Sequence, residues 1–402
     1  MKKILVVLAV CLFAVSAFAQ DESANFKYGL DAWAYGLYAK QTKDQYNYQH
    51  IRVRPTFEAG VENFKAVVGL EVDQFYGAGP GGSGGDFAGE GTDNQVVKVK
   101  WGYVQANNLF IPNLSVTTGL KDFYLPVVVD NDFALTSVDY KFDMGSFTAS
   151  YIKLDEGNVQ EESSLLGKNK DDREAYIADL TLNLGAINLR PSYVWVKEAA
   201  SSRRVSVYSV NATGDMGVIA FDGTFSYLTD KTGSASAALA HAYDLGLTYK
   251  GVENYEFTLF SALQSGDKPG NPKKTGYNAT LNGVFGETPD GRLFLVGGSD
   301  IGTNGGEQIF NISDAAHGLF VIGLSGKTQM DKFSIFAQYG FVMGAIEYLP
   351  ESDAIIGHEF DIELGYEVAK GTTLFTQAAF LLADDDYGKN QMYAAWGLKT
   401  KL

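Results

Sequence analysis

The feature that most constrains the fold is a pair of alternating runs joined by a tight turn between residues 50 and 76. In the first run, apolar residues take every second position from 51 to 59, and residues such as Arg52 and Arg54 take the positions between. The second run repeats this pattern from 64 to 73. A period of two predicts β-strands with one dry face and one wet face. Such a hairpin needs either a second sheet or a bilayer against its apolar face.

The start of the chain has the pattern of a secretory signal. Lys2 and Lys3 precede an apolar run that ends in an Ala-x-Ala cleavage site, so we expect a signal peptide at 1–19 and export from the cytoplasm. The remainder, 20–402, is expected to form a single domain. Cys11 is the chain's one cysteine and lies in the expected signal, so the mature protein would have neither a disulfide nor thiol chemistry.

The rest of the chain has no apolar run near the roughly 18 residues that a transmembrane helix needs. It offers instead about 18 alternating segments, each of about 7 to 14 residues, which suits strands that cross a bilayer at a tilt. Short connections such as 185–186 alternate with long polar ones such as 155–173. We therefore predict an all-β fold, a transmembrane antiparallel up-and-down β-barrel of 16 to 18 strands, with both chain ends on the periplasmic side.

The alternation also predicts which side chains face lipid. In 187–195 and in 333–341 the odd-numbered residues are mostly apolar or aromatic, and polar residues lie between them. Aromatic residues near strand ends predict interfacial girdles. The residues assigned to these girdles are Trp33, Tyr35, Tyr38, Trp101, Tyr103, Tyr393 and Trp396.

Charged residues at the predicted inward positions are candidates for lining the pore and setting its selectivity. They are Arg52, Arg54, Glu71, Asp73, Lys98, Lys100, Lys121, Arg190, Glu359, Asp361 and Glu363. Opposed basic and acidic walls would create a transverse field that orients hydrated solutes. Alternatively, these residues hydrate a wide lumen and pair across neighbouring strands, as Glu71 could with Arg52 or Lys98.

A barrel of this size encloses an aqueous channel, so we expect a loop to narrow it. The candidates are the Gly-rich loop 77–94 and the longest loop, 266–314. The second contains the apolar stretch 293–298, which is unlike a freely solvated loop and would fold inward or form further strands.

Motifs for other chemistry are weak. Residues 81–85 fit G-x-S-x-G, but they lie in a Gly-rich loop with no helix after them. The four histidines are too scattered for a recognisable metal site, and the acidic residues 384–386 either bind calcium or form an exposed acidic loop. The formal net charge of −16 disfavours nucleic acid as a partner. We predict a protein that is not an enzyme and holds no cofactor or metal.

Part of the sequence resembles a known family. Arg52-Val-Arg54, the run Gly-Leu-Glu-Val-Asp-Gln-Phe-Tyr-Gly at 69–77, Val-Lys-Val-Lys-Trp-Gly-Tyr at 97–103 and 119–126 are similar to the amino-terminal third of bacterial homotrimeric outer-membrane porins. More distantly, they are similar to barrels of the alginate-export type. The last strand resembles the assembly signal of outer-membrane barrels, although it ends in Leu402 where Phe or Trp is usual. The resemblance implies a passive diffusion pore that is homotrimeric.

We therefore expect an outer-membrane porin that lets small hydrophilic solutes or ions diffuse through a water-filled channel. Its expected partners are outer-membrane lipid, the solute and two further copies of itself. One alternative is a polysaccharide channel of the alginate type, for export or uptake, which would need a continuous basic lumen. Another is a plugged structural or adhesive surface barrel, which would not conduct.

Overall fold

The computed structural model describes residues 25–40, 45–78, 96–155, 173–199, 201–233, 237–266, 276–285, 292–296, 318–344, 355–384 and 389–402. The expected signal peptide lies outside these ranges, as does most of the Gly-rich loop 77–94.

Eighteen β-strands make up the sheet, at the upper end of the predicted range. They are β1 (Asn25–Lys40), β2 (Gln45–Val61), β3 (Phe64–Ala78), β4 (Val96–Asn107), β5 (Leu114–Leu125), β6 (Val129–Phe142), β7 (Gly145–Asp155), β8 (Arg173–Leu184), β9 (Ile187–Glu198), β10 (Arg203–Asp215), β11 (Ile219–Thr232), β12 (Ala238–Val252), β13 (Tyr255–Ser265), β14 (Gly318–Met330), β15 (Phe333–Met343), β16 (Ile355–Ala369), β17 (Thr372–Ala383) and β18 (Gln391–Lys401). Between β13 and β14, the described part of the chain contains the helix α2 (Tyr277–Phe285).

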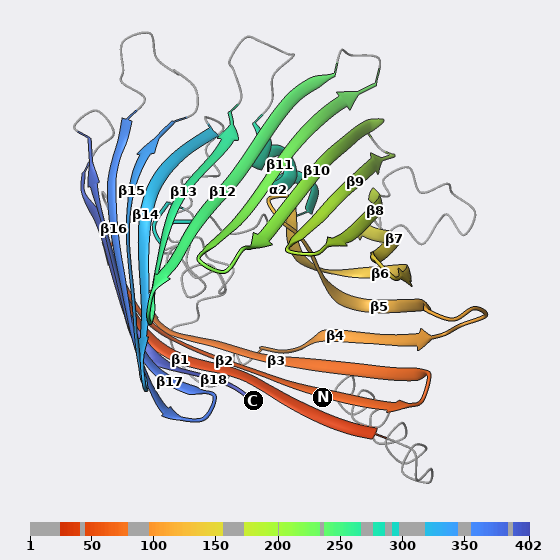
Figure 1. Cartoon of the computed structure of the whole chain (residues 1–402), viewed down its shortest axis with the longest axis horizontal. Helices are drawn as coiled ribbons and strands as arrows, with labels where there is room; N and C mark the ends of the chain where they lie inside the picture. The colour runs from red at the N-terminus through yellow and green to blue at the C-terminus, as the bar shows by residue number, and fades with distance from the viewer. Residues whose placement is uncertain are drawn as a thin grey trace.

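Each strand pairs antiparallel with its neighbours in the chain, and β1 also pairs with β18, which closes the barrel (Figure 1). Leu30 and Leu402 seal this junction by exchanging backbone hydrogen bonds of 3.1 and 2.8 Å. Closure matters because an open sheet edge in lipid would leave backbone N–H and C=O groups without partners. Among the described residues, no helix has both the length and the apolar character to cross a bilayer.

The two faces of the wall differ as the alternation predicts. On β2, Ile51 exposes 39% of its surface on the outside, whereas His50 and Arg52 beside it expose 0% and 4% on the inside. The predicted outward faces are confirmed on β9 and β15, where Tyr193 and Phe333 are exposed. The outer surface is therefore an apolar, lipid-facing band over a mostly polar interior.

The girdle assignment was wrong for most of its aromatic residues. Trp33 and Tyr35 lie opposite Arg52 and His50 in the β1–β2 ladder, and cross-strand partners share a face, so both rings point inward. Trp101 and Tyr103 also turn inward, because a bulge between β3 and β4 shifts the alternation by one residue. Tyr393 is buried on the inner face as well, where its hydroxyl donates to the Gln377 side chain. Trp396, in contrast, exposes 54% of its surface on the outside.

At one end of the barrel, short turns join each even-numbered strand to the next strand, from β2–β3 to β16–β17, as predicted. The other end carries the long connections, including that between β13 and β14. The alternation of lengths is not strict, because β1–β2, β5–β6 and β9–β10 are joined by short connections at this second end too. Short turns mark the periplasmic side of an outer-membrane barrel.

Two apolar clusters lie inside the barrel, where a water-filled lumen would have none. One packs the ends of β1 and β14–β18 around Leu293, Leu295 and Val296. The other packs the inner face of β6–β12 around α2. The described parts of the connection between β13 and β14, α2 and residues 292–296, therefore lie inside the barrel, and we call them the inserted segment. This confirms that residues 293–296 turn inward, although 292–296 form turns rather than a strand.

Candidate channel constriction

A network of ion pairs covers the inner wall at β2 and β3. The Arg52 guanidinium donates to the Asp73 carboxylate, with Nη2 2.6 Å from Oδ2. His50 lies between that same carboxylate and the Tyr35 hydroxyl, which is 2.9 Å from its Nδ1. The buried imidazole and guanidinium thus share one carboxylate, and β1, β2 and β3 are joined through side chains as well as backbone.

Glu71 forms the second centre of this network. Its carboxylate, 1% exposed, accepts from Arg54 at 2.5 Å and from the Lys98 ammonium of β4 at 2.6 Å. Arg52 and Arg54 also stack over the Trp33 ring, 5.0 and 5.2 Å from its centre. These contacts are the cross-strand pairing that the sequence left as the alternative to opposed charged walls.

The other basic candidates also have partners. The Lys100 ammonium contacts the Asp132 carboxylate, which also accepts a 3.0 Å hydrogen bond from the Trp101 indole. Lys121 lies over the Tyr103 ring at 5.6 Å. Arg190 pairs with Asp179, at 2.9 Å.

Two of the acidic candidates on β16, Glu359 and Asp361, bind residues 294–296 of the inserted segment. Glu359 is fully buried, and its two carboxylate oxygens accept the backbone N–H groups of Leu295 at 2.5 Å and Val296 at 3.1 Å. Asp361 accepts the N–H of Phe294 at 3.1 Å and a 2.6 Å hydrogen bond from Gln338. Glu359 and Asp361 therefore act as acceptors for a turn of the loop.

Glu363 lies on the same face of β16, but its partners among the described residues belong to β17 and β18. It accepts from the Gln377 side chain and from the Lys399 ammonium at 3.2 Å. Only β17, β18 and β1 separate β16 from the basic residues of β2. The acidic residues of β16 and the basic residues of β2 are thus on neighbouring parts of the wall, whereas six strands separate β16 from Arg190 on β9.

Arg292 is a key residue that the sequence analysis missed. Its guanidinium contacts Asp222 on β11 and donates through Nε to Asp244 on β12 at 2.9 Å, while its carbonyl accepts from Gln338 on β15 at 2.9 Å. Burial lowers the pKa of Arg292, but hydrogen bonds and charges from Asp244 and Asp222 outweigh this and raise it. One loop residue thereby ties together three strands of the wall. No local motif marks an arginine within a long loop as an anchor.

The helix α2 is anchored on the other side of the same segment. The fully buried Tyr277 hydroxyl donates to Ser226 on β11 at 2.6 Å, and burial raises the pKa of this hydroxyl. At the end of the helix, the Phe285 carbonyl accepts from Asn131 on β6 at 2.9 Å, and its ring meets that of Phe133 edge-on. A sequence signal for this site existed, since strands such as β10 carry apolar residues on both faces.

The connection between β5 and β6 contributes to the same cluster. Leu125, Val128 and Val129 each expose at most 1% of their surface and pack in the cluster with α2. Val127 takes a left-handed φ of 64°, an unfavourable conformation for a β-branched residue. This turn therefore bends inward to complete the packing around the helix.

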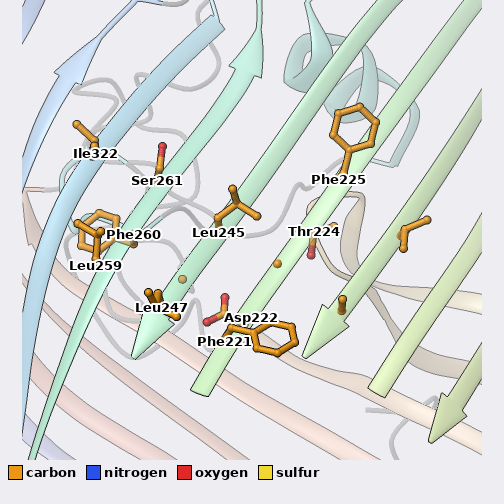
Figure 2. Close-up of a pocket in the computed structure, with 14 residues that line it drawn as sticks. Phe221, Asp222, Thr224, Phe225, Leu245, Leu247, Leu259, Phe260, Ser261 and Ile322 are labelled. Carbon is orange, nitrogen blue, oxygen red and sulfur yellow. The ribbon is translucent and has the colours of Figure 1, made fainter. Parts of the chain in front are cut away.

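A hollow of about 640 Å³ lies on the outer face of the wall, not in the lumen. Figure 2 shows its rim, with Phe225, Leu245, Leu259 and Ile322 around it. These side chains belong to the exposed apolar face of β11–β14. The hollow therefore contacts lipid and is not a solute site.

One further sequence candidate falls largely outside the described residues. Of the acidic loop 384–386, only Asp384 is described, so the calcium alternative is not tested. Within the described part of the chain, no group of three or more His, Cys, Asp or Glu side chains is placed to hold a metal ion.

Comparison with solved structures identifies the fold. The chain matches OccK9 (OpdG) of Pseudomonas aeruginosa with a TM-score of 0.60 at 12% identity, covering 96% of this chain and 99% of that one. It matches the outer membrane protein OpdK of the same organism with a TM-score of 0.59 at 10% identity, covering 94% and 98%. For OccAB2 of Acinetobacter baumannii the TM-score is 0.58 at 12% identity, with 94% and 98% covered.

No protein-family model and no curated protein sequence matches the chain. The structural matches nevertheless extend over nearly the whole barrel, and the apolar outer face fits a bilayer. The chain therefore has the fold of these solved barrels, a closed antiparallel β-barrel of eighteen strands.

Proposed function

We propose that the protein is a channel for the passive diffusion of small hydrophilic solutes or ions, narrowed by the inserted segment that contains α2 and residues 292–296. The observation that carries the proposal is the exposure of charged side chains inside the closed wall. The side chains of Lys98, Lys399 and Asp222 expose 53%, 47% and 45% of their surface. Charged groups keep such exposure only where water reaches them.

The inserted segment supports a constriction rather than a freely moving loop. One described part, α2, lies beside β11 and β6. The other, residues 292–296, contacts β15, β16 and β18, where the Phe294 ring stacks on Phe336 and lies next to Tyr393. Buried hydrogen bonds hold it at both ends of this path. We infer that the solute passes beside this segment, along the charged wall of β2–β4.

The mixed pairing of the wall bears on charge preference. Because the Glu71 carboxylate contacts three cations and the Asp73 carboxylate contacts the Arg52 guanidinium, the field there is local and depends on the geometry of the pairs. We propose that the exposed Lys98 and the half-buried Arg190 contribute most to a preference for anions. The acidic partners also interrupt the continuous basic lumen that a polyanion exporter would need.

The homotrimer implied by the sequence resemblance is a separate part of the proposal. Each chain closes its own barrel through β1 and β18, so one copy is sufficient for one pore. A trimer would then conduct in groups of three equal steps, and a monomer in single steps.

The test is the conductance of the folded protein in a planar lipid bilayer with a salt gradient. We expect stable current steps that scale with salt concentration, and the reversal potential will give the charge preference. Silence from protein that is demonstrably folded would refute the channel in favour of a plugged or adhesive barrel.

A further inference from the structure

The turns at the periplasmic end divide into two arcs of different character. Four consecutive turns, β4–β5, β6–β7, β8–β9 and β10–β11, have apolar or small residues at their tips. The other four, β12–β13, β14–β15, β16–β17 and β2–β3, have charged tips: Glu253, Asp331 with Lys332, Lys370, and Glu62. Because the barrel is closed, each set is one continuous half of the rim.

The tips of the apolar arc are exposed. Phe110 exposes 92% of its surface, Met216 61%, Met144 57% and Val218 53%. Large apolar side chains exposed together in this way mark a surface that contacts another apolar phase. We name this half of the rim, defined by Phe110, Met144, Met216 and Val218, the apolar arc.

The β4–β5 turn holds Phe110 outward. Phe110 has a left-handed φ of 65°, unusual for a bulky residue. The turn is closed around it by the Ile111 N–H donating to the Leu109 carbonyl at 2.8 Å and by the Asn113 N–H donating to the Asn108 side chain at 3.0 Å. The ring is thus presented by a structured turn.

At the β6–β7 and β10–β11 turns, the apolar arc adjoins the lipid-facing surface directly. Tyr140 and Phe147, cross-strand partners just above the β6–β7 turn, are exposed on the outer face, as is Ile219 just above the β10–β11 turn. Asp143 and Asp215 lie in these same turns, and charged groups are tolerated among lipid headgroups but not in the hydrocarbon. This continuity specifies the partner as lipid, at headgroup depth.

We propose that the apolar arc inserts into the headgroup region of the periplasmic leaflet, whereas the charged half of the rim stays in water. The barrel is then seated asymmetrically in the membrane, deeper at β4–β11 than at β12–β3. Large apolar and aromatic side chains are stabilised at such an interface, and this contact would set the tilt of the pore.

Site-directed spin labelling in phospholipid vesicles tests the proposal. In a Cys11→Ala background, which has no other cysteine, nitroxides are placed by Phe110→Cys, Met144→Cys and Met216→Cys, and in matched controls by Glu62→Cys, Asp331→Cys and Lys370→Cys. We expect the ratio of collision rates with oxygen to those with a water-soluble nickel complex to be several-fold higher for the first three labels.

Equal collision-rate ratios at all six positions would overturn the proposal. Spin–spin broadening confined to labels on the apolar arc would also overturn it, because such broadening would show that a second copy of the protein, rather than lipid, contacts the arc. Folding of each variant is checked by its heat-dependent gel mobility, and Val218→Cys replaces any member of the apolar arc that fails to fold. The readout does not depend on conductance, so it is independent of the proposed channel function.

Discussion

Replacing Glu359 with alanine should release the inserted segment from β16. The carboxylate is fully buried and accepts two backbone N–H groups, those of Leu295 and Val296. Alanine removes both acceptors and leaves two buried donors without partners. The rest of the barrel wall should be unaffected, because the backbone ladder of β16 with β15 and β17 does not involve this side chain.

The expected loss can be worked from these two bonds. A buried hydrogen-bond donor that is left without its acceptor costs about 1 to 3 kcal/mol. Removing the Glu359 carboxyl group from beside Asp361 recovers part of the summed cost, because burying two carboxyl groups side by side is itself unfavourable. A net loss of about 3 kcal/mol remains, which would raise the population of the released segment by roughly a hundredfold.

Limited trypsin digestion measures this population. Arg292, the only tryptic site among the described residues of the segment, lies directly before the buried turn at 293–296. When opening is fast relative to cleavage, the cleavage rate follows the equilibrium population of the open form. We therefore expect cleavage after Arg292 about a hundredfold faster than in the parent protein, together with larger fluctuations of the open-channel current.

Glu363→Ala is the matched control. Glu363 lies on the same face of β16, but it pairs with Gln377 and Lys399 instead of the loop. If Glu359→Ala and Glu363→Ala are cleaved at the same rate as the parent, the carboxylate does not anchor the segment and the reasoning is refuted.

Four further predictions concern the same lumen. Arg292→Met should lower the free energy of releasing the inserted segment by about 2 kcal/mol, since the partly exposed Asp222 and Asp244 lose their charge-assisted hydrogen bonds. Chymotrypsin should then cleave within the segment faster than in the parent protein. Tyr277→Phe should lower the stability of the folded protein by about 1 kcal/mol, because the hydrogen bond to Ser226 is lost. Burial raises the pKa of Tyr277, so the contribution of its hydroxyl to stability is full below the ordinary pKa of about 10 and is lost as pH rises through the higher folded-state pKa. Thermal unfolding measured over a series of pH values follows this loss. Replacing Arg52 and Arg54 together with serine should shift the reversal potential toward cations, and an unchanged value would exclude both from the filter. Deleting 266–314 should raise single-channel conductance, and an unchanged conductance would place that loop outside the solute path.

The strand prediction succeeded because a barrel wall imposes its period on every segment. A strand with lipid outside and water inside must alternate apolar and polar residues, so all eighteen strands can be located from local sequence. The inner or outer position of an individual aromatic residue needs more information. The bulge between β3 and β4 turned Trp101 inward, and no local pattern marks an extra residue of that kind.

In the candidate site too, some features could be predicted from local sequence and others depend on the tertiary structure. Side chains such as Arg52 and Glu71 could be assigned to the lumen, and even paired, because they lie on adjacent strands. The roles of Glu359 and Asp361 could not be predicted, because they depend on a loop that is distant in sequence. Arg292 meets Asp222 and Asp244 only after that loop has folded back onto the wall.

The sequence by itself therefore determined the class of fold, the positions of the strands and the face of most side chains, since these follow from a period of two and the two solvents on either side of the wall. Only the tertiary structure decided what fills the lumen. An apolar stretch such as 293–296 indicates that it is buried. Which strands it packs against depends on contacts between segments that are distant in sequence, and a single sequence carries no periodic signal for such contacts.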